Sequence, residues 1–302
     1  MNARTPVAIA AALLALGTAV SAQQRDNMSA EERARVQAER ERAYQEEMAM
    51  VNPLEPLNSV WIDELTWIEV RDAIAGGKTT AIVPTGGIEQ NGPYLATGKH
   101  NYVLQSACDA IARRLGNALC TPVLKLVPEG DPENIRYPGT LSLRQETFQL
   151  VLTDVSNSLK SQGFTDVILI GDSGGNQRGL QATADVLNTA WAGTGATAYY
   201  IPEYYNYGDV LEYMENELGY VETVDDGYHD DFYITSLMML TNPTSVRYHQ
   251  RVQAGGGLET INGLSITPIN QALEVGKRLL EFRVEATVSA IHAAMAERET
   301  GR

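Results

Sequence analysis

The sequence predicts an α/β fold in which helices wrap a mostly parallel β-sheet. Two observations lead to it. From about Ser59 onward, β-rich apolar runs alternate with helical segments, and the run 167–171 is continuously apolar, as strands buried on both faces are. The chain has 302 residues, of which 44% are hydrophobic, so it holds enough material for one large domain or two small ones.

The expected elements begin with a helix that Thr66 caps, with Glu69 completing a capping box and Gly76-Gly77 ending the helix. The elements expected after it are, in order, a strand over 79–84, a helix over 102–115, a strand over 120–127, a helix over 145–162, a strand over 167–171, a helix over 178–192, a strand over 196–201, a helical run over 234–240 and a helix over 268–298. The last helix carries one apolar face, suited to packing or to contact between subunits.

The N-terminal residues are predicted to lie outside this fold. A basic start at Arg4, an apolar run over 6–20 and small residues before position 23 are typical of a secretory signal peptide, residues 1–22. An uncleaved anchor is the alternative, although the run is short for a membrane span. Residues 23–58 are expected to be a charged helical leader and linker, and 59–302 the main α/β domain. We therefore expect a periplasmic or secreted protein.

Charge and cysteine content exclude several functions. With 23 basic and 38 acidic residues the net charge is −15, which disfavours binding to nucleic acid or to anionic lipid. The two cysteines are too few for a disulfide-built scaffold or a four-thiolate zinc site. In an oxidising compartment Cys108 and Cys120 could pair, or they could remain separate buried thiols.

Three polar loops are candidates for the functional site, because ligands of open parallel sheets collect at the carboxyl ends of the strands. The loops cover 84–101, 171–176 and 227–231, and together they contain carboxylates and imidazoles, the side chains that bind divalent metals: Glu89, His100, Asp172, His229, Asp230 and Asp231. Alternatively, each carboxylate caps a helix. The string 171–175 also matches the nucleophile segment of chymotrypsin-like proteases, but it follows a buried strand and the chain lacks their histidine setting.

Four segments resemble motifs of the creatininase (creatinine amidohydrolase) family. They are Pro84–Tyr94, Tyr137–Ser142, Gly171–Asn176 and His229–Leu237, and the resemblance extends from about Trp61 to Ala294. It implies a three-layer α/β/α sandwich with a mostly parallel central sheet. It also implies a metal-dependent hydrolase of amide C–N bonds and a homo-oligomer, commonly ring-shaped.

The metal-ligand positions of that family are largely replaced here. Glu89 matches the first ligand, but the other ligand positions fall on Asn91, His100, Ser173 and Ile234. Because a neutral imidazole does not readily bridge two cations, we expect at most one divalent ion, zinc or else manganese. Glu89, His100 and Asp172 are its predicted ligands.

A metal at three protein ligands would activate a water molecule. Its proton is expected to pass to His229, Asp230 or Asp231. The predicted oxyanion and substrate contacts are Asn91, Ser173, Gly174 and Gly175, with Glu133 and Tyr137 on the substrate side, where ordinary loop solvation is the alternative. Tyrosines at 204, 205 and 207 are expected to form a pocket wall or an oligomer contact.

The predicted function is metal-dependent hydrolysis of an amide, lactam or related cyclic C–N bond in a small molecule. The exchanged ligands argue against creatinine itself as the substrate. One alternative is a catalytically silent protein of this fold that binds a small molecule or acts as an oligomeric scaffold. Another is a metal-free glycoside-type hydrolase that uses paired carboxylates such as Glu89 and Asp172.

Overall fold

The structure is a computed structural model that describes residues 28–300. The predicted signal peptide lies outside the described residues. The chain divides into two units, up to Glu55 and from Pro56 onward. In the first, helix α2 (Ala30–Met48) begins at a capping box between Ser29 and Glu32 and has no buried residue.

The second unit is built on a parallel sheet, as predicted. Its strands are β1 (Thr80–Thr85), β2 (Ala118–Cys120), β3 (Asp166–Gly171) and β4 (Thr197–Tyr200), in the order β2-β1-β3-β4. All neighbouring pairs are parallel, and Thr85 at the end of β1 lies opposite Gly171 at the end of β3. The loops that follow β1 and β3 therefore start side by side.

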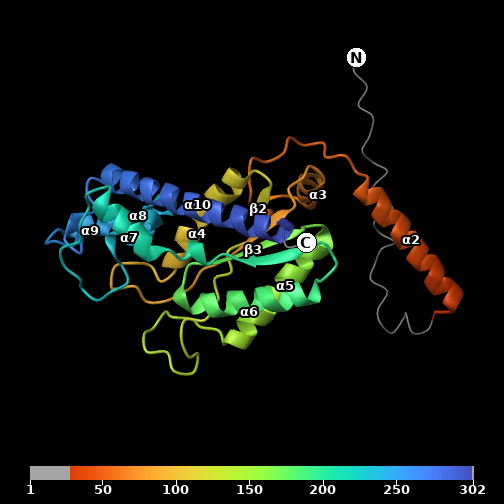
Figure 1. Cartoon of the computed structure of the whole chain (residues 1–302), viewed down its shortest axis with the longest axis horizontal. Helices are drawn as coiled ribbons and strands as arrows, with labels where there is room; N and C mark the ends of the chain where they lie inside the picture. The colour runs from red at the N-terminus through yellow and green to blue at the C-terminus, as the bar shows by residue number, and fades with distance from the viewer. Residues whose placement is uncertain (1–27, 301–302) are drawn as a thin grey trace, which may run out of the picture. The chain divides into compact units, whose positions relative to one another are not determined.

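Helices cover both faces of the sheet and give three layers (Figure 1). Helices α4 (Lys99–Leu115) and α10 (Ile269–Thr300) pack on the face that carries Ile82 and Ile168. Helices α5 (Gln145–Gln162) and α6 (Gln177–Ala190) pack on the face that carries Val83 and Leu169. This division follows from the period-two alternation of side chains along a strand, and it confirms the predicted α/β/α sandwich.

A third apolar cluster lies along the first half of α10. It joins α7 (Tyr207–Asn216), α8 (Phe232–Thr241), α9 (Tyr248–Ala254) and the small hairpin of β5 (Thr260–Ile261) and β6 (Leu264–Ser265). The sequence indicated α8 but not α7, α9 or the hairpin. Helix α3 (Trp67–Ala75) has the predicted capping box between Thr66 and Glu69.

Two expected boundaries differ from those in the structure. The strand expected over 120–127 ends at Cys120, two residues before Pro122. The chain beyond it stays against β1, since Leu124 N donates to Pro84 O at 2.9 Å. Helix α4 begins at Lys99 rather than at residue 102, directly after Gly98.

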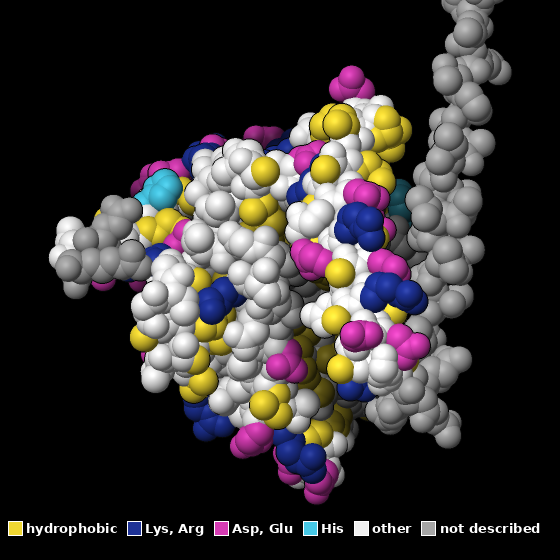
Figure 2. Space-filling view, turned by 90° about the vertical axis from the view of Figure 1, so that its right-hand side faces the viewer, with side chains coloured by type: hydrophobic (Ala, Val, Ile, Leu, Met, Phe, Trp, Pro, Cys, Tyr) yellow, Lys and Arg dark blue, Asp and Glu magenta, His cyan; other side chains and the backbone are white. Residues whose placement is uncertain are grey.

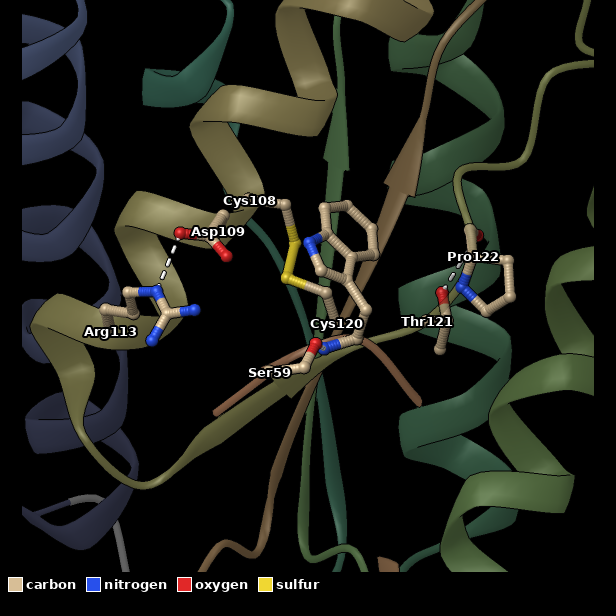
Figure 3. Close-up of a disulfide and its surroundings, with 8 residues drawn as sticks. Ser59, Cys108, Asp109, Arg113, Cys120, Thr121 and Pro122 are labelled. Atoms are coloured by element: carbon tan, nitrogen blue, oxygen red, sulfur yellow. Dashed lines mark hydrogen bonds and ion pairs between the residues drawn. A yellow bond between two sulfur atoms is a disulfide. The ribbon is translucent and has the colours of Figure 1, made fainter. Parts of the chain in front are cut away.

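The two cysteines form a disulfide that links α4 to β2 (Figure 3). Both Cys108 and Cys120 are fully buried within the core that α4 and α10 make with the sheet. Of the two possibilities that the sequence left open, the structure therefore has the paired one.

The face drawn in Figure 2 carries acidic side chains interspersed with basic ones. Of the helices in the described part of the chain, none combines the length and the apolar character that crossing a membrane requires.

Candidate functional site

A polar cavity of about 460 Å³ opens among the loops at the carboxyl ends of the strands. That volume is within the usual range for small-molecule sites. Its ionisable lining residues come from the loops after β1 and β2, the start of α4, and the segment before α8: Glu89, Lys99, His100, Glu129, His229 and Asp231. The loop after β3 contributes Ser173, Gly174 and Gly175, and Tyr205, Tyr207 and Tyr233 form an aromatic wall.

Amide side chains hold these loops in place. Asn176 Nδ2 donates to the carbonyl oxygens of Thr85 and Gly86, both at 2.9 Å, and so ties the loop after β3 to the loop after β1. Asn101, in the first turn of α4, accepts from Gly87 N at 3.2 Å and donates to Gly87 O at 2.8 Å. The backbone that carries Glu89 is therefore fixed against α4, which carries His100.

The three predicted metal ligands come together as a hydrogen-bonded chain. His100 Nε2 lies 2.9 Å from Glu89 Oε1, and His100 Nδ1 lies 2.8 Å from Asp172 Oδ2. The imidazole thus stands between two carboxylates and uses a different ring nitrogen for each. Of the three residues, Glu89 and His100 line the cavity, while Asp172 is fully buried behind them.

Asp172 is held by a cluster of buried polar groups. Its Oδ1 lies 2.9 Å from Nη2 of Arg283 on α10 and accepts from Tyr204 OH at 3.0 Å. Its Oδ2 accepts from Tyr207 OH at 2.5 Å in addition to its contact with His100. The Arg283 guanidinium is fully buried and lies over the rings of Tyr204 and Tyr207, at 4.2 and 4.4 Å from their centroids. Both carboxylate oxygens are therefore engaged.

The neighbouring charges and hydrogen bonds keep Glu89, His100 and Asp172 ionised. Burial alone would raise the pKa of Asp172, but Arg283 and the hydrogen bonds from His100 and Tyr207 lower it to about 2. Burial opposes the charging of His100, yet its hydrogen bonds with Asp172 and Glu89 outweigh burial and raise its pKa. The pKa of Glu89 falls to about 2 against the effect of burial, through His100, Lys99 and His229.

Glu129 differs from these carboxylates. Its Oε2 accepts from Ser173 Oγ at 2.8 Å, whereas its Oε1 is buried without a hydrogen-bond partner among the described residues. Burial and the nearby negative charge of Glu89 raise the pKa of Glu129 to about 7, although His100, Ser173 and Lys99 act in the opposite direction. A carboxyl group with a pKa near neutrality can both accept and donate a proton.

Lys99 is the second cation at the cavity. Its ammonium group is almost completely buried, lies 3.6 Å from Glu89 Oε1 and donates to His229 O at 3.0 Å. The His229 side chain is largely exposed, with Nδ1 3.6 Å from Glu89 Oε1. Asp231 lines the cavity and accepts from Asn262 at 3.0 Å.

Besides Asp172 and Tyr204, four predicted site residues are not among those that line this cavity. Asn91 is buried and donates to Glu89 O at 2.9 Å. Asp230 is buried, and burial with nearby acidic residues raises its pKa to about 6. Glu133 is exposed and pairs with Arg144, and Tyr137 is exposed with the Arg136 guanidinium 5.3 Å from its ring centroid. For Glu133 and Tyr137, surface solvation describes the structure better than substrate contact.

Sequence reasoning missed Glu129, Lys99 and Arg283. Glu129 was within reach, because it follows the segment read as a strand over 120–127, and the carboxyl-end rule applies to that strand as well. Lys99 adjoins His100 in a loop already singled out. Arg283 gave no signal, since a single arginine in a long amphipathic helix is ordinarily a solvated residue.

Comparison with known proteins now identifies the family. The family model for creatininase, described as creatinine amidohydrolase, matches residues 63–297. The chain belongs to the creatininase family. A creatinine amidohydrolase of Pseudomonas putida is 28% identical over 115 residues, a match that spans 37% of this chain and 44% of that relative. The aligned part is thus less than half the length of that protein.

Solved creatininases have the same fold as this family member. One mutant creatininase superposes with a TM-score of 0.59 at 22% identity, covering 78% of this chain and 99% of that one. A mutant creatininase complexed with creatine gives 0.58 at 21% identity, covering 78% and 99%. A mutant creatininase of the Zn-Zn type gives 0.56 at 21% identity, covering 79% and 99%, and a further solved creatininase is described as the Mn form.

The donor set of this creatininase-family chain does not fit a metal ion. His100 has no lone pair left for a metal while both ring nitrogens contact carboxylates, and Asp172 is enclosed by Arg283 and two tyrosines. Among the residues that the structure describes, no three or more His, Cys, Asp and Glu side chains are grouped so as to hold a metal. Glu89, His100 and Asp172 meet as predicted, but they do not surround a common point.

Proposed function

We propose that this protein hydrolyses a C–N bond of a small amide, lactam or related cyclic compound in the cavity, with Glu129 transferring the proton. Membership of the creatininase family supports the reaction class. The cavity volume of about 460 Å³ supports a small substrate. The observation that carries the proposal is Glu129, a cavity-lining carboxyl group with one oxygen unpartnered and a pKa raised to about 7 by burial and by Glu89.

The reaction that we propose has a simple proton balance. Ionised Glu129 accepts a proton from a water molecule as its oxygen adds to the substrate carbonyl carbon. The C–N bond then breaks, and Glu129 returns the proton to the leaving nitrogen. Ser173, which donates to Oε2 at 2.8 Å, orients the carboxylate so that Oε1 takes part in the transfer.

Glu129→Gln provides the test, with Glu274→Gln on the exposed surface of α10 as its matched control. Both are assayed with the wild type against small lactams, cyclic ureas and linear amides, creatinine included, in buffers without chelator. Products are identified by mass spectrometry as the gain of one water. For a substrate that is turned over, we expect Glu129→Gln to lower kcat/KM about 10²- to 10⁴-fold and Glu274→Gln to leave it unchanged.

The wild-type rate should rise with pH through about 7 as Glu129 ionises. Full activity of Glu129→Gln would remove Glu129 from the mechanism. A wild type that binds a compound of the panel, seen as a raised melting temperature, but hydrolyses none would contradict the enzymatic proposal and favour a small-molecule binder.

A further inference from the structure

The position of His100 between two carboxylates fixes what the ring can do. Its two nitrogens lie 2.9 Å from Glu89 Oε1 and 2.8 Å from Asp172 Oδ2. Neither acceptor has a proton to give when ionised, so both contacts are hydrogen bonds only if both ring nitrogens carry hydrogen. With both carboxylates ionised, this geometry requires an imidazolium, which has no lone pair to offer a metal ion.

Lys99 adds a second cation beside the same carboxylate. Its Nζ lies 3.6 Å from Glu89 Oε1, and its contact with His229 O, at 3.0 Å, keeps the ammonium group at this place. The side chain is 4% exposed, so water screens its charge only weakly. A divalent ion at Glu89 would meet two fixed positive charges at short range, and that repulsion is strong in a buried site.

Arg283 neutralises Asp172 at the carboxylate oxygen that His100 does not contact. Arg283 is fully buried and lies 2.9 Å from Oδ1. Negative and positive groups therefore alternate from Glu89 through His100 and Asp172 to Arg283, with Lys99 beside the first of them. The chain's own side chains already balance the two carboxylates.

We infer that Lys99 and His100 replace a divalent cation in this site, which accordingly holds no Zn²⁺ or Mn²⁺. Solved relatives include Zn-Zn and Mn forms, so this chain would be a member of the family that keeps the fold and supplies the positive charge from protein side chains. The inference goes beyond the proposed function, because it holds whether or not the cavity hydrolyses a substrate.

Measuring the metal content of the wild-type protein tests directly whether the site holds Zn²⁺ or Mn²⁺. Protein purified without chelator, and the same protein after incubation with ZnCl₂ or MnCl₂ and desalting, is analysed by inductively coupled plasma mass spectrometry. We expect well under one ion per chain and no rise in melting temperature with either metal. About one ion per chain, lost in Glu89→Gln but kept in Glu274→Gln, would overturn the inference.

A substitution that reverses the charge at position 100 tests whether the imidazolium is what excludes the metal ion. His100→Asp removes the imidazolium and adds a carboxylate beside Glu89 and Asp172, so it should bind Zn²⁺ or Mn²⁺ and gain melting temperature when either is added. His292→Asp, at an exposed histidine of α10, should gain nothing. A folded His100→Asp variant that takes up no metal would refute the claim that the cation at position 100 excludes the ion.

A spectroscopic measurement needs no substitution of Glu89, His100 or Asp172. The chain has four histidines, so the ring signals in a ¹⁵N NMR spectrum can be assigned with variants at the exposed positions 229, 249 and 292. At about pH 8, where a free imidazole is neutral, both His100 nitrogens should be protonated. A neutral His100 ring would overturn the inference. Hydrolysis that requires bound metal would also overturn it while leaving the proposed hydrolysis standing.

Discussion

Arg283 and Asp172 form an ion pair that is shielded from solvent on both sides. The two residues come from α10 and from the loop after β3, and Nη2 lies 2.9 Å from Oδ1 with neither side chain exposed. A buried pair of this kind contributes little as a pair, but removing one partner leaves an uncompensated charge in the core.

Arg283→Met should therefore lower the free energy of unfolding by about 3–5 kcal/mol, measured by urea denaturation. Adding Asp172→Asn should restore part of this loss, because the stranded charge is then gone. Arg278→Met, at an exposed position of the same helix, should change stability by less than about 0.5 kcal/mol. Equal effects at 283 and 278 would mean that Asp172 needs no buried counterion.

The raised pKa of Glu129 predicts a specific dependence of stability on pH. Its pKa in the folded protein is about 7 against an ordinary value of 4.5, so the folded state binds this proton more tightly than the unfolded chain does. The resulting stabilisation is fully present below about pH 4.5 and is lost as pH rises through about 7. It amounts to at most about 3 kcal/mol.

Glu129→Gln removes this dependence. Compared with the wild type, the variant should gain relative stability between about pH 5 and pH 8, which urea denaturation at a series of pH values measures directly. The charged groups that face Glu129 are Glu89, His100 and Lys99, and all of them remain in the variant. Parallel stability curves for the two proteins would show that Glu129 titrates normally.

Ser173 should act on Glu129 rather than on the substrate. Its hydrogen bond to Oε2, at 2.8 Å, favours the charged carboxylate and lowers the pKa of Glu129. Ser173→Ala should consequently move the midpoint of the pH–rate profile upward and reduce kcat near neutral pH by about tenfold, the worth of one such hydrogen bond. Complete loss of activity, together with a substrate-derived adduct on wild-type Ser173 detected by mass spectrometry, would instead make Ser173 the nucleophile.

The meeting of Glu89, His100 and Asp172 was predictable because it depends on topology. Glu89 and Asp172 lie in the loops that follow β1 and β3, and His100 lies in the first turn of α4, which follows the β1 loop. The register of β1 and β3 places the starts of the two loops side by side. What the three residues form was not predictable. Two carboxylates and an imidazole suit a metal site and a hydrogen-bonded relay equally, and the difference lies in ring orientation and in Arg283.

Arg283 also shows why the fold was easier to predict than the site. The layers follow from alternating strands and helices, and a helix keeps its apolar face whether or not one arginine lies in it. The pairing of Arg283 with Asp172 depends on how α10 packs over the end of the sheet, and a local pattern carries no information about that. Helices α7 and α9 were missed because their sequences lack clear caps.

The buried disulfide should stabilise the layer formed by α4 and the sheet. Cys108 and Cys120 close a loop of 12 residues between α4 and β2, for which the chain-entropy relation gives about 3 kcal/mol. The double substitution of both cysteines by alanine should lower the melting temperature, and wild-type protein treated with a reductant under denaturing conditions should refold to the same lower value. An unchanged melting temperature in both experiments would mean that core packing holds α4 without the bond.

Gly87 makes room for Glu129, and this close approach gives a prediction specific to the site. A Cβ atom at position 87 would lie 1.8 Å from Glu129 Oε1 and 3.2 Å from His100 Cδ2. Because Oε1 is the end of a flexible side chain, Gly87→Ala should fold but push the Glu129 carboxylate out of position. We expect kcat/KM to fall towards that of Glu129→Gln, with a much smaller change in melting temperature.

Gly208→Ala is the matched control, since a Cβ there meets no atom within 4 Å and the residue lies in the first turn of α7. It should leave activity intact and add about 0.4–1 kcal/mol of stability by restricting the unfolded chain. If Gly87→Ala keeps wild-type activity while Glu129→Gln loses it, the carboxylate works from a position other than the one beside Gly87. The proton transfer would then have to be placed elsewhere in the cavity.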